Sequence, residues 1–413
     1  MSKKLVIAGV AIAVAAAAVY CGSVVYGKGK FKEVVYSAEG IKSPLGTQEL
    51  PLFKVASQES TGFSSDKYQM NLNVGNITLP FELVSDFGVK SVSTKINVKE
   101  DDIRKISSSK GVAEAFKFLT EHSLVTYSAL SNSLVYTLKV DSFSKPQVTL
   151  EGGLVQVKCK DLSAGCNDKN VYTEIGFNKL DIPAPYKVHL GNYLLKSGFD
   201  SEYYLDNSLK SITVDMASSG KIDVKNVESS FKTTEISKDT TIDLSHKFTI
   251  EDLNYEGNDL KVSLDDFGLN ISLSKVNVKP ALELCKDQKI DSDCAQLIVG
   301  KLNSDDDEEA SAFLSSLITK DTSAQIALNT EINDAKVKAD VAINFTDGFD
   351  IDSPNVKLKA DASVDASIFE KLPVVALVAE PMKMYAADPK SSVLEYHLTV
   401  DGDKIELNGK PLF

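Results

Sequence analysis

Four of the five cysteines fall into two local pairs, Cys159 with Cys166 and Cys285 with Cys294. An even number of cysteines in an exported domain is typical of disulfides, so we predict that each pair closes a short surface loop. A zinc site is the alternative, but neither pair has the two-residue spacing of a zinc knuckle and no histidine is near. We therefore predict no metal. In a cytoplasmic chain the same residues would be buried free thiols.

Histidines can act as general acids and bases, and the chain has four of them, none sharing a local element with another: His122, His189, His246 and His397. His397 alternates with apolar neighbours, which places it on the solvated face of a strand. His246 has the apolar phase of its strand, in line with Leu244 and Phe248. At such a position we expect a histidine that neighbouring groups satisfy, not a ligand.

The sequence lacks the locally readable motifs of the main enzyme classes. It has no G-x-S-x-G elbow, no GK[ST] phosphate loop, no Rossmann glycine fingerprint and no H-E-x-x-H helix. We therefore predict a protein that is not an enzyme, with no catalytic residue and no cofactor. An extracytoplasmic enzyme of an unrecognised type stays open as an alternative, because a triad assembled from distant segments leaves no local motif.

The overall charge argues against one class of partner. The 58 acidic and 45 basic residues give a net charge of -13. This charge disfavours a surface that follows phosphates, so nucleic acid is not an expected partner. With 43% hydrophobic and 25% charged residues, the composition is that of a folded chain.

The N-terminal residues predict a membrane anchor. Two lysines precede an uncharged apolar stretch, and about 20 such residues span the core of a bilayer. We predict a cytoplasmic tip at residues 1–4, a transmembrane signal anchor at residues 5–27 and export of the rest, because the short basic side stays in the cytoplasm. A signal peptide cleaved after Ala17 or Ala18 is the alternative.

Beyond the anchor, apolar and polar residues alternate strictly, as they do in strands with one buried and one solvated face. The longest alternating runs are Tyr68 to Val74, Tyr136 to Val140, Thr241 to Glu251, Ile326 to Ile332, Val337 to Phe345 and Val356 to Val364. The last three runs are joined by short connections, the first of them at Asn333-Asp334. They predict an antiparallel meander.

Helical spacing is confined to short segments. Ser304 can cap a helix whose first turn carries the acidic run Asp305 to Glu309, and a weaker helix is expected over Gly111 to Glu121. The acidic run lacks the spaced pattern of a calcium loop, so complementing the helix dipole is its expected role.

The predicted fold class is α+β, predominantly β. It consists of long twisted antiparallel sheets with a few packing helices, after one N-terminal transmembrane helix. We divide the exported part provisionally into a strand-rich region, residues 28–280, and a helical insert followed by the meander, residues 281–413.

The two ends of the chain carry a resemblance to a known family. The lysine-flanked anchor is matched at the other end by the strand Tyr396 to Val400 and the closing segment Asn408-Gly409-Lys410-Pro411. This arrangement resembles the YdgA-like family of bacterial inner-membrane-anchored periplasmic proteins of unknown function, whose chains commonly close on a similar Asn-Gly-Lys-Pro. The chain departs from the family by lacking tryptophan and by its two cysteine pairs. The resemblance implies an anchored periplasmic protein and supplies no catalytic residue.

These expectations combine into a single-pass protein of the bacterial inner membrane with most of the chain in the periplasm. We expect it to act by binding or scaffolding, or alternatively as a lipid carrier or tether with an apolar groove. The expected partners are the inner membrane through the N-terminal helix, a lipid or another envelope protein, and a second copy of the chain in a homodimer paired at strand edges.

Overall fold

The computed structural model describes most of the chain from residue 53 onward. The described residues are 53–61, 65–74, 77–87, 91–99, 101–102, 114, 117–118, 120–128, 133–160, 169–257, 260–285, 297–298, 300–301, 307–346, 356–372 and 379–412. The predicted cytoplasmic tip and signal anchor, residues 1–4 and 5–27, lie outside them. None of the helices formed by the described residues is both long and apolar enough to cross a membrane.

The predicted α+β class is wrong, because the described part of the chain is predominantly β. It contains 19 strands and four α-helices, and every strand pairing described is antiparallel. The helices have 4 to 11 residues, too few to form a layer of their own, whereas one strand reaches 17. The transmembrane helix that the predicted class included is not found among the described residues.

The chain divides into two compact units. Unit 1 takes in the chain up to Lys145 together with Thr149–Lys179 and Leu194–Phe199, and unit 2 takes in Pro146–Val148, Leu180–Tyr193 and everything from Asp200 onward. Residue 280, the provisional boundary from the sequence, lies inside unit 2 in α5 (Lys279–Glu283). Each unit is described by itself.

Unit 1 is an antiparallel meander in which β1 to β6 pair in chain order. Its strands are β1 (Phe53–Ser60), β2 (Ser65–Val74), β3 (Ile77–Phe87), β4 (Ser91–Asn97), β5 (Ser123–Ser128) and β6 (Ser133–Lys145), with most of β7 (Val148–Cys159) and β8 (Val171–Ile182). One face is buried, since Tyr68, Met70 and Leu83 are fully covered. The strand predicted to begin at Tyr68 is confirmed by β2.

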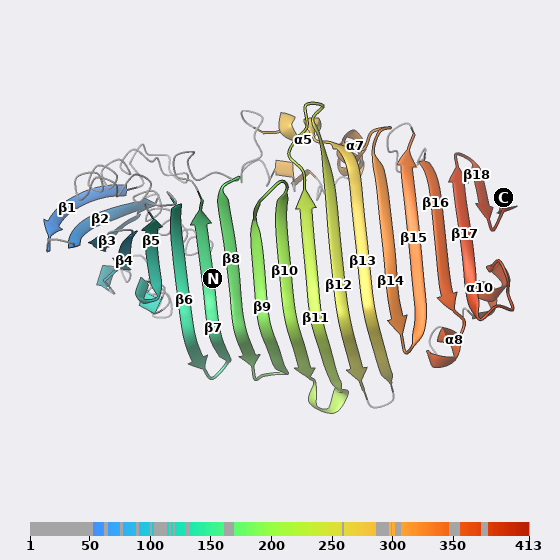
Figure 1. The fold of residues 1–413 in the computed structure, drawn as a ribbon, viewed down its shortest axis with the longest axis horizontal. Helices are drawn as coiled ribbons and strands as arrows, with labels where there is room; N and C mark the ends of the chain where they lie inside the picture. The colour runs from blue at the N-terminus through green and yellow to red at the C-terminus, as the bar shows by residue number, and fades with distance from the viewer. Residues whose placement is uncertain are drawn as a thin grey trace. The chain divides into compact units, whose positions relative to one another are not determined.

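Unit 2 holds the longer strands, which pair in chain order from β10 to β19 and lie side by side in Figure 1. They are β10 (Tyr203–Asp215), β11 (Lys221–Thr233), β12 (Thr241–Glu256), β13 (Lys261–Asn277), β14 (Ser323–Ile332), β15 (Ala335–Phe345), β16 (Val356–Asp365), β17 (Val393–Asp401), β18 (Lys404–Leu407) and β19 (Lys410–Pro411). Before them, β9 (Lys187–Phe199) pairs with β10.

The predicted meander is confirmed by β14, β15 and β16. Ile332 and Ala335 are cross-strand partners, so Asn333 and Asp334 form a two-residue turn, and their φ angles are 47° and 61°. Two positive φ values are the mark of a type I′ turn, which matches the twist of a hairpin and favours asparagine, aspartate and glycine. The same chemistry recurs at Asn408 and Gly409, with φ of 51° and 72°, between β18 and β19.

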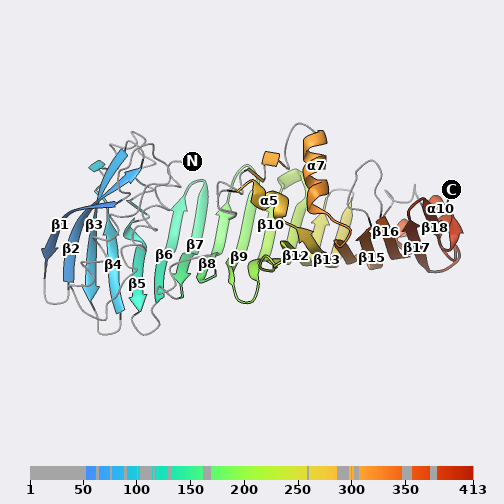
Figure 2. The ribbon, with the colours of Figure 1, turned by 90° about the horizontal axis from the view of Figure 1, so that it is seen from above.

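In the part of unit 2 that the structure describes, four short helices accompany the strands. Figure 2 shows α5 and α7 (Asp307–Leu317) on one side of a single layer of strands. The other two, α8 (Ile368–Lys371) and α10 (Ala379–Tyr385), follow β16. A single 3-10 turn, η3 (Ala217–Ser219), joins β10 to β11. The helix predicted after Ser304 is confirmed from Asp307 onward, whereas Ser304 itself lies outside the described residues.

Candidate functional site

Cross-strand pairing in unit 2 puts apolar residues, interrupted once by His246, opposite one another on nine consecutive strands. Each residue of the following series is the direct partner of the next, from β10 to β18; we call the series the apolar row: Leu205, Phe231, His246, Ile271, Ile326, Val341, Ala360, Leu398 and Leu407. A parallel second row crosses the same nine strands two residues away: Tyr203, Thr233, Leu244, Leu273, Ala324, Ile343, Leu358, Val400 and Ile405. Because side chains alternate between the faces of a strand, both rows lie on one face, the apolar face.

The apolar row is only half-covered by the rest of the chain. Seven of its residues, from His246 to Leu407, are half-buried, and Leu205 and Phe231 are each 38% exposed. Strands lie about 4.8 Å apart, so a row across nine strands extends for roughly 38 Å. Soluble chains normally bury such a series in a core, and an apolar patch of this length that keeps solvent exposure marks a binding surface.

Helices close the apolar face at both ends of the strands. Next to α5 and α7, Val276 and Ala324 are buried, and the side-chain amide of Asn277 donates a hydrogen bond of 3.0 Å to the Ser316 carbonyl of α7. At the opposite strand ends, α8 and α10 cover Ala335 and Leu394, both fully buried. The middle of the strands, where the apolar row runs, lies between these two covered ends.

Residues with positive φ lie at the level where the apolar phase of β11 and β13 takes an odd step. Asn226 in β11 and Asp266 in β13 have positive φ, 45° and 48°. In β11, Val224 and Val227 are three residues apart, and they pair with Leu253 and Ile250 of β12, which are also three apart, so the register does not change at Asn226. Between β13 and β14 the register shifts by one residue between Asp265 and Gly268, which marks a bulge at Asp266. Asparagine and aspartate tolerate this left-handed conformation better than other residues with a side chain.

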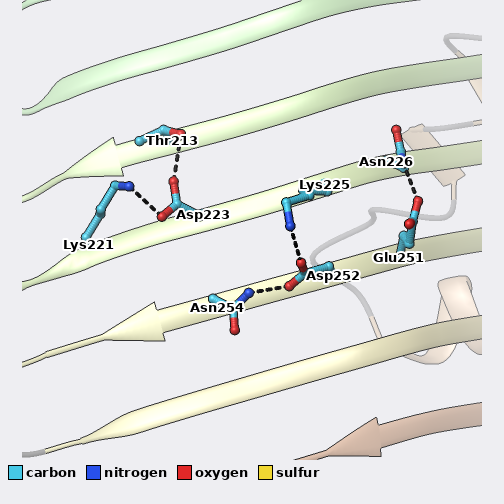
Figure 3. Close-up of polar contacts among 8 residues, drawn as sticks. All are labelled: Thr213, Lys221, Asp223, Lys225, Asn226, Glu251, Asp252 and Asn254. Carbon is cyan, nitrogen blue, oxygen red and sulfur yellow. Dashed lines mark hydrogen bonds and ion pairs between the residues drawn. The ribbon is translucent and has the colours of Figure 1, made fainter.

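The opposite face of unit 2 is polar. Figure 3 shows its contacts on β10 to β12, where Lys225 Nζ lies 2.5 Å from the Asp252 carboxylate and Lys221 Nζ lies 2.7 Å from Asp223. Thr213 Oγ1 donates a hydrogen bond of 2.8 Å to Asp223. Two open depressions on this face, between β11 and β14, share Lys247 and the exposed Asn270. These contacts are those of a solvated surface.

The hydrogen bond from Lys221 lowers the pKa of Asp223, and the Thr213 hydroxyl lowers it further. A carboxyl whose pKa is lower in the folded chain stabilises the fold above its ordinary pKa of about 3.9, and loses this effect as the pH falls through the folded-state value. We therefore expect Asp223→Asn to reduce the decline of the urea midpoint with falling pH below about 4. Asp239→Asn, in the exposed connection between β11 and β12, should decline like the wild type. Equal slopes for Asp223→Asn and wild type would contradict the assignment.

The four histidines belong to different elements, as the sequence indicates: His122 precedes β5, and His189, His246 and His397 lie in β9, β12 and β17. Two of them meet carboxylates. Nδ1 of His189 lies 2.6 Å from Asp181, and Nδ1 of His397 lies 2.7 Å from Asp361. The His397 hydrogen bond, followed by that of Lys359, lowers the pKa of Asp361. His397 is exposed, so its prediction on the solvated face is confirmed.

His246 lies on the apolar face, in agreement with the sequence, and has a polar neighbour there. Its Nε2 is 3.0 Å from Ser229 Oγ of β11. Ser229 pairs directly with Asn207 of β10, whose Oδ1 accepts a hydrogen bond of 3.1 Å from Tyr193 Oη of β9. These four residues, the polar cluster, interrupt the apolar face on four consecutive strands. The sequence reasoning missed three of them, although polar residues at apolar-phase positions of a strand were a readable signal.

The predicted disulfides are only half described. Cys159 ends β7 and Cys285 follows α5, with 3% and 8% exposure. Cys166 and Cys294 lie outside the described residues, so both pairings stay predictions. Among the residues that the structure describes, no group of histidine, cysteine, aspartate and glutamate side chains is arranged to hold a metal ion.

Comparison with known proteins adds no relative: no family model matches the chain, and neither a curated protein nor a solved structure matches it. The resemblance to the YdgA-like family therefore stays a prediction.

Proposed function

We propose that this chain is a binding protein that holds acyl chains on the apolar face of unit 2. The observation that carries the proposal is the apolar row, nine directly paired residues that keep partial exposure along one face. Covering apolar surface stabilises a complex by about 25 cal/mol per Å². A row of roughly 38 Å is longer than one leaflet of a bilayer core, about 15 Å, so a complete acyl chain fits along it.

The composition of the two rows favours lipid over protein as the occupant. Protein interfaces are enriched in aromatic residues, methionine and arginine. The rows contain no arginine and no methionine, and their aromatic rings, apart from the imidazole of His246, are those of Tyr203 and Phe231. The remaining members are leucine, isoleucine, valine, alanine and one threonine, which suit hydrocarbon. A hydrophobic segment of an envelope protein is the competing occupant.

Pairing of a second copy at the last strand is disfavoured by the chain itself. β19 has two residues, and the second is Pro411, which has no backbone N–H to donate. Short edge strands that contain proline are a common protection against edge-to-edge association. A homodimer would therefore need a different surface.

We also propose that the protein acts in the bacterial envelope. The support is in the sequence, where two lysines and an uncharged apolar stretch precede the described residues, and four cysteines form two local pairs. Lipids, which carry acyl chains, are abundant in the bacterial envelope.

The proposal is tested by site-specific photocrosslinking of the full chain in cells. A benzophenone amino acid is placed at Val341, in the apolar row, and in a matched chain at Asp340, the exposed neighbour on the opposite face of β15. We expect lipid adducts at position 341, detected by mass spectrometry, and few at position 340. Adducts at 341 that consist of a second copy or another protein, or equal lipid labelling at both positions, would overturn the proposal.

A further inference from the structure

We propose that the ligand is an acyl chain with an oxygen-bearing end, bound with that end at the polar cluster and its chain along the apolar row. The inference rests on the proposed function and specifies its ligand. The oxygen-bearing end is a carboxyl or an ester group, which present the same carbonyl acceptor to the protein.

The polar cluster has hydrogen-bonding capacity left for a ligand. Tyr193 Oη donates to Asn207 Oδ1, and Ser229 Oγ pairs with His246 Nε2. Within the described part of the chain, no hydrogen bond engages Nδ2 of Asn207 or Nδ1 of His246. Nδ2 of Asn207 is a donor, and Nδ1 of His246 is also a donor when the Ser229 hydroxyl donates to Nε2. Two donors on one face suit the oxygens of a carboxyl or ester group.

The position of the polar cluster on the apolar face fixes the direction in which the bound acyl chain runs. Asn207 and Ser229 are cross-strand partners on β10 and β11, so their side chains are about 5 Å apart. Beyond His246 on β12, the apolar row continues without a polar residue through Ile271, Ile326 and Val341. Val341 lies three strands from His246, about 14 Å away, which is close to the thickness of one bilayer leaflet, about 15 Å. The far end of an acyl chain whose oxygen-bearing end binds at the polar cluster therefore reaches β15.

A polar cluster on an otherwise apolar face needs a reason, because polar groups that lose water without a hydrogen bond are unfavourable. Four consecutive strands each contribute one member of the cluster, while the same face on β13 to β16 is aliphatic around the apolar row. The apolar face thus has a polar part at one end and an aliphatic part beyond it. An amphiphile with one acyl chain matches this arrangement, with its polar group at the polar part and its hydrocarbon along the aliphatic part.

The test uses three photoreactive probes with chains of twelve carbons: dodecanoic acid, methyl dodecanoate and dodecane, each with a diazirine at the far end of the chain. Purified full-length protein in an amphipathic polymer is labelled with each, and the adducts are mapped. We expect the acid or the ester to label the β15 peptide at least about fivefold more than dodecane, the effect of about one hydrogen bond. Preference for the acid alone identifies a free fatty acid, and equal labelling by the ester extends the ligand class to esterified lipids.

Variants separate the inference from the function on which it rests. Asn207→Leu/His246→Leu should lower acid and ester labelling to the level of dodecane while dodecane labelling stays unchanged. Asn270→Leu, an exposed substitution on the polar face, should keep the wild-type preference. Equal labelling by all three probes in the wild type, or an unchanged preference in the double variant, would overturn the inference and leave the proposed function intact. Absence of labelling by every probe would overturn both.

Discussion

Ile326→Asp is expected to lower the amount of lipid bound to the full chain at least tenfold. Ile326 occupies the middle of the apolar row, between Ile271 of β13 and Val341 of β15. An ionised carboxylate in contact with hydrocarbon loses water without a compensating partner, and the resulting free-energy cost exceeds the roughly 1.4 kcal/mol that corresponds to a factor of ten. The measurement is the acyl content per mole of purified protein, supported by photocrosslinking at Val341.

Gln325→Asp is the matched control for this variant. Gln325 is the preceding residue of β14, is exposed and faces the polar side. It receives the same charge on the same strand, so any general effect of charge or of β propensity appears in both variants. Because Ile326 is half-buried, Ile326→Thr provides a second, milder change for the case in which the aspartate variant unfolds. Equal lipid content in Ile326→Asp, Ile326→Thr and Gln325→Asp would show that the apolar row does not hold the lipid.

Leu394→Ala is expected to destabilise unit 2 by about 2 to 5 kcal/mol. Leu394 of β17 is fully buried in the cluster formed with Ala335 and the residues of α8 and α10. Removing its side chain loses transfer free energy and leaves a cavity, because the surrounding residues relax into the vacated space only in part. The measurement is the urea midpoint of the full chain, together with hydrogen exchange of the β17 amides.

Val393→Ala is the control, since Val393 precedes Leu394 on the same strand and is 43% exposed. Surface substitutions of this kind change the free energy of unfolding by about 0.5 kcal/mol or less. A similar loss in both variants would mean that α8 and α10 do not pack on β17 as described. Both variants should retain lipid at temperatures where they are folded, because the apolar row lies away from this cluster.

The strands that the sequence predicted could be found because their residues follow a period of two, which one less exposed face imposes. Thr241 to Glu251 and the three runs of the meander lie inside the strands that the structure contains. The turn at Asn333-Asp334 was readable for a similar reason, since both residues accept positive φ. These signals involve residues that are close together in the sequence, so a single sequence is enough to detect them.

The fold class was mispredicted because short helical segments were weighted as if they formed a layer. The helix predicted after Ser304 has 11 described residues, and α8, which follows β16, has four. Their role is to cover strand ends. Sequence spacing gives the type of a segment but not how much of a sheet it can cover, which depends on the number of strands that pair.

Single polar residues of the candidate site left a signal in the sequence, but their assembly into a site could not be predicted, for a different reason. Partial exposure of the apolar row is a property of the assembled sheet, since Ile271 and Ile326 look like core residues in the sequence. The polar cluster depends on the register of β10, β11 and β12, which pairing across the sheet sets and a single sequence does not show. A one-residue change in register would have moved Ser229 and His246 to opposite faces.

The positions with positive φ also give this part of the sheet a modular construction. From β9 to β13, alternate strands carry a residue with positive φ, at Asn192 in β9, Asn226 in β11 and Asp266 in β13, so a pair of strands with one such position recurs in this part of the sheet. Inserting or deleting a whole hairpin would change the length of the apolar row by two strand spacings, about 10 Å, without reversing either face. The number of hairpins therefore sets the length of the ligand that fits on the apolar face. Duplication within the gene could change this number one hairpin at a time.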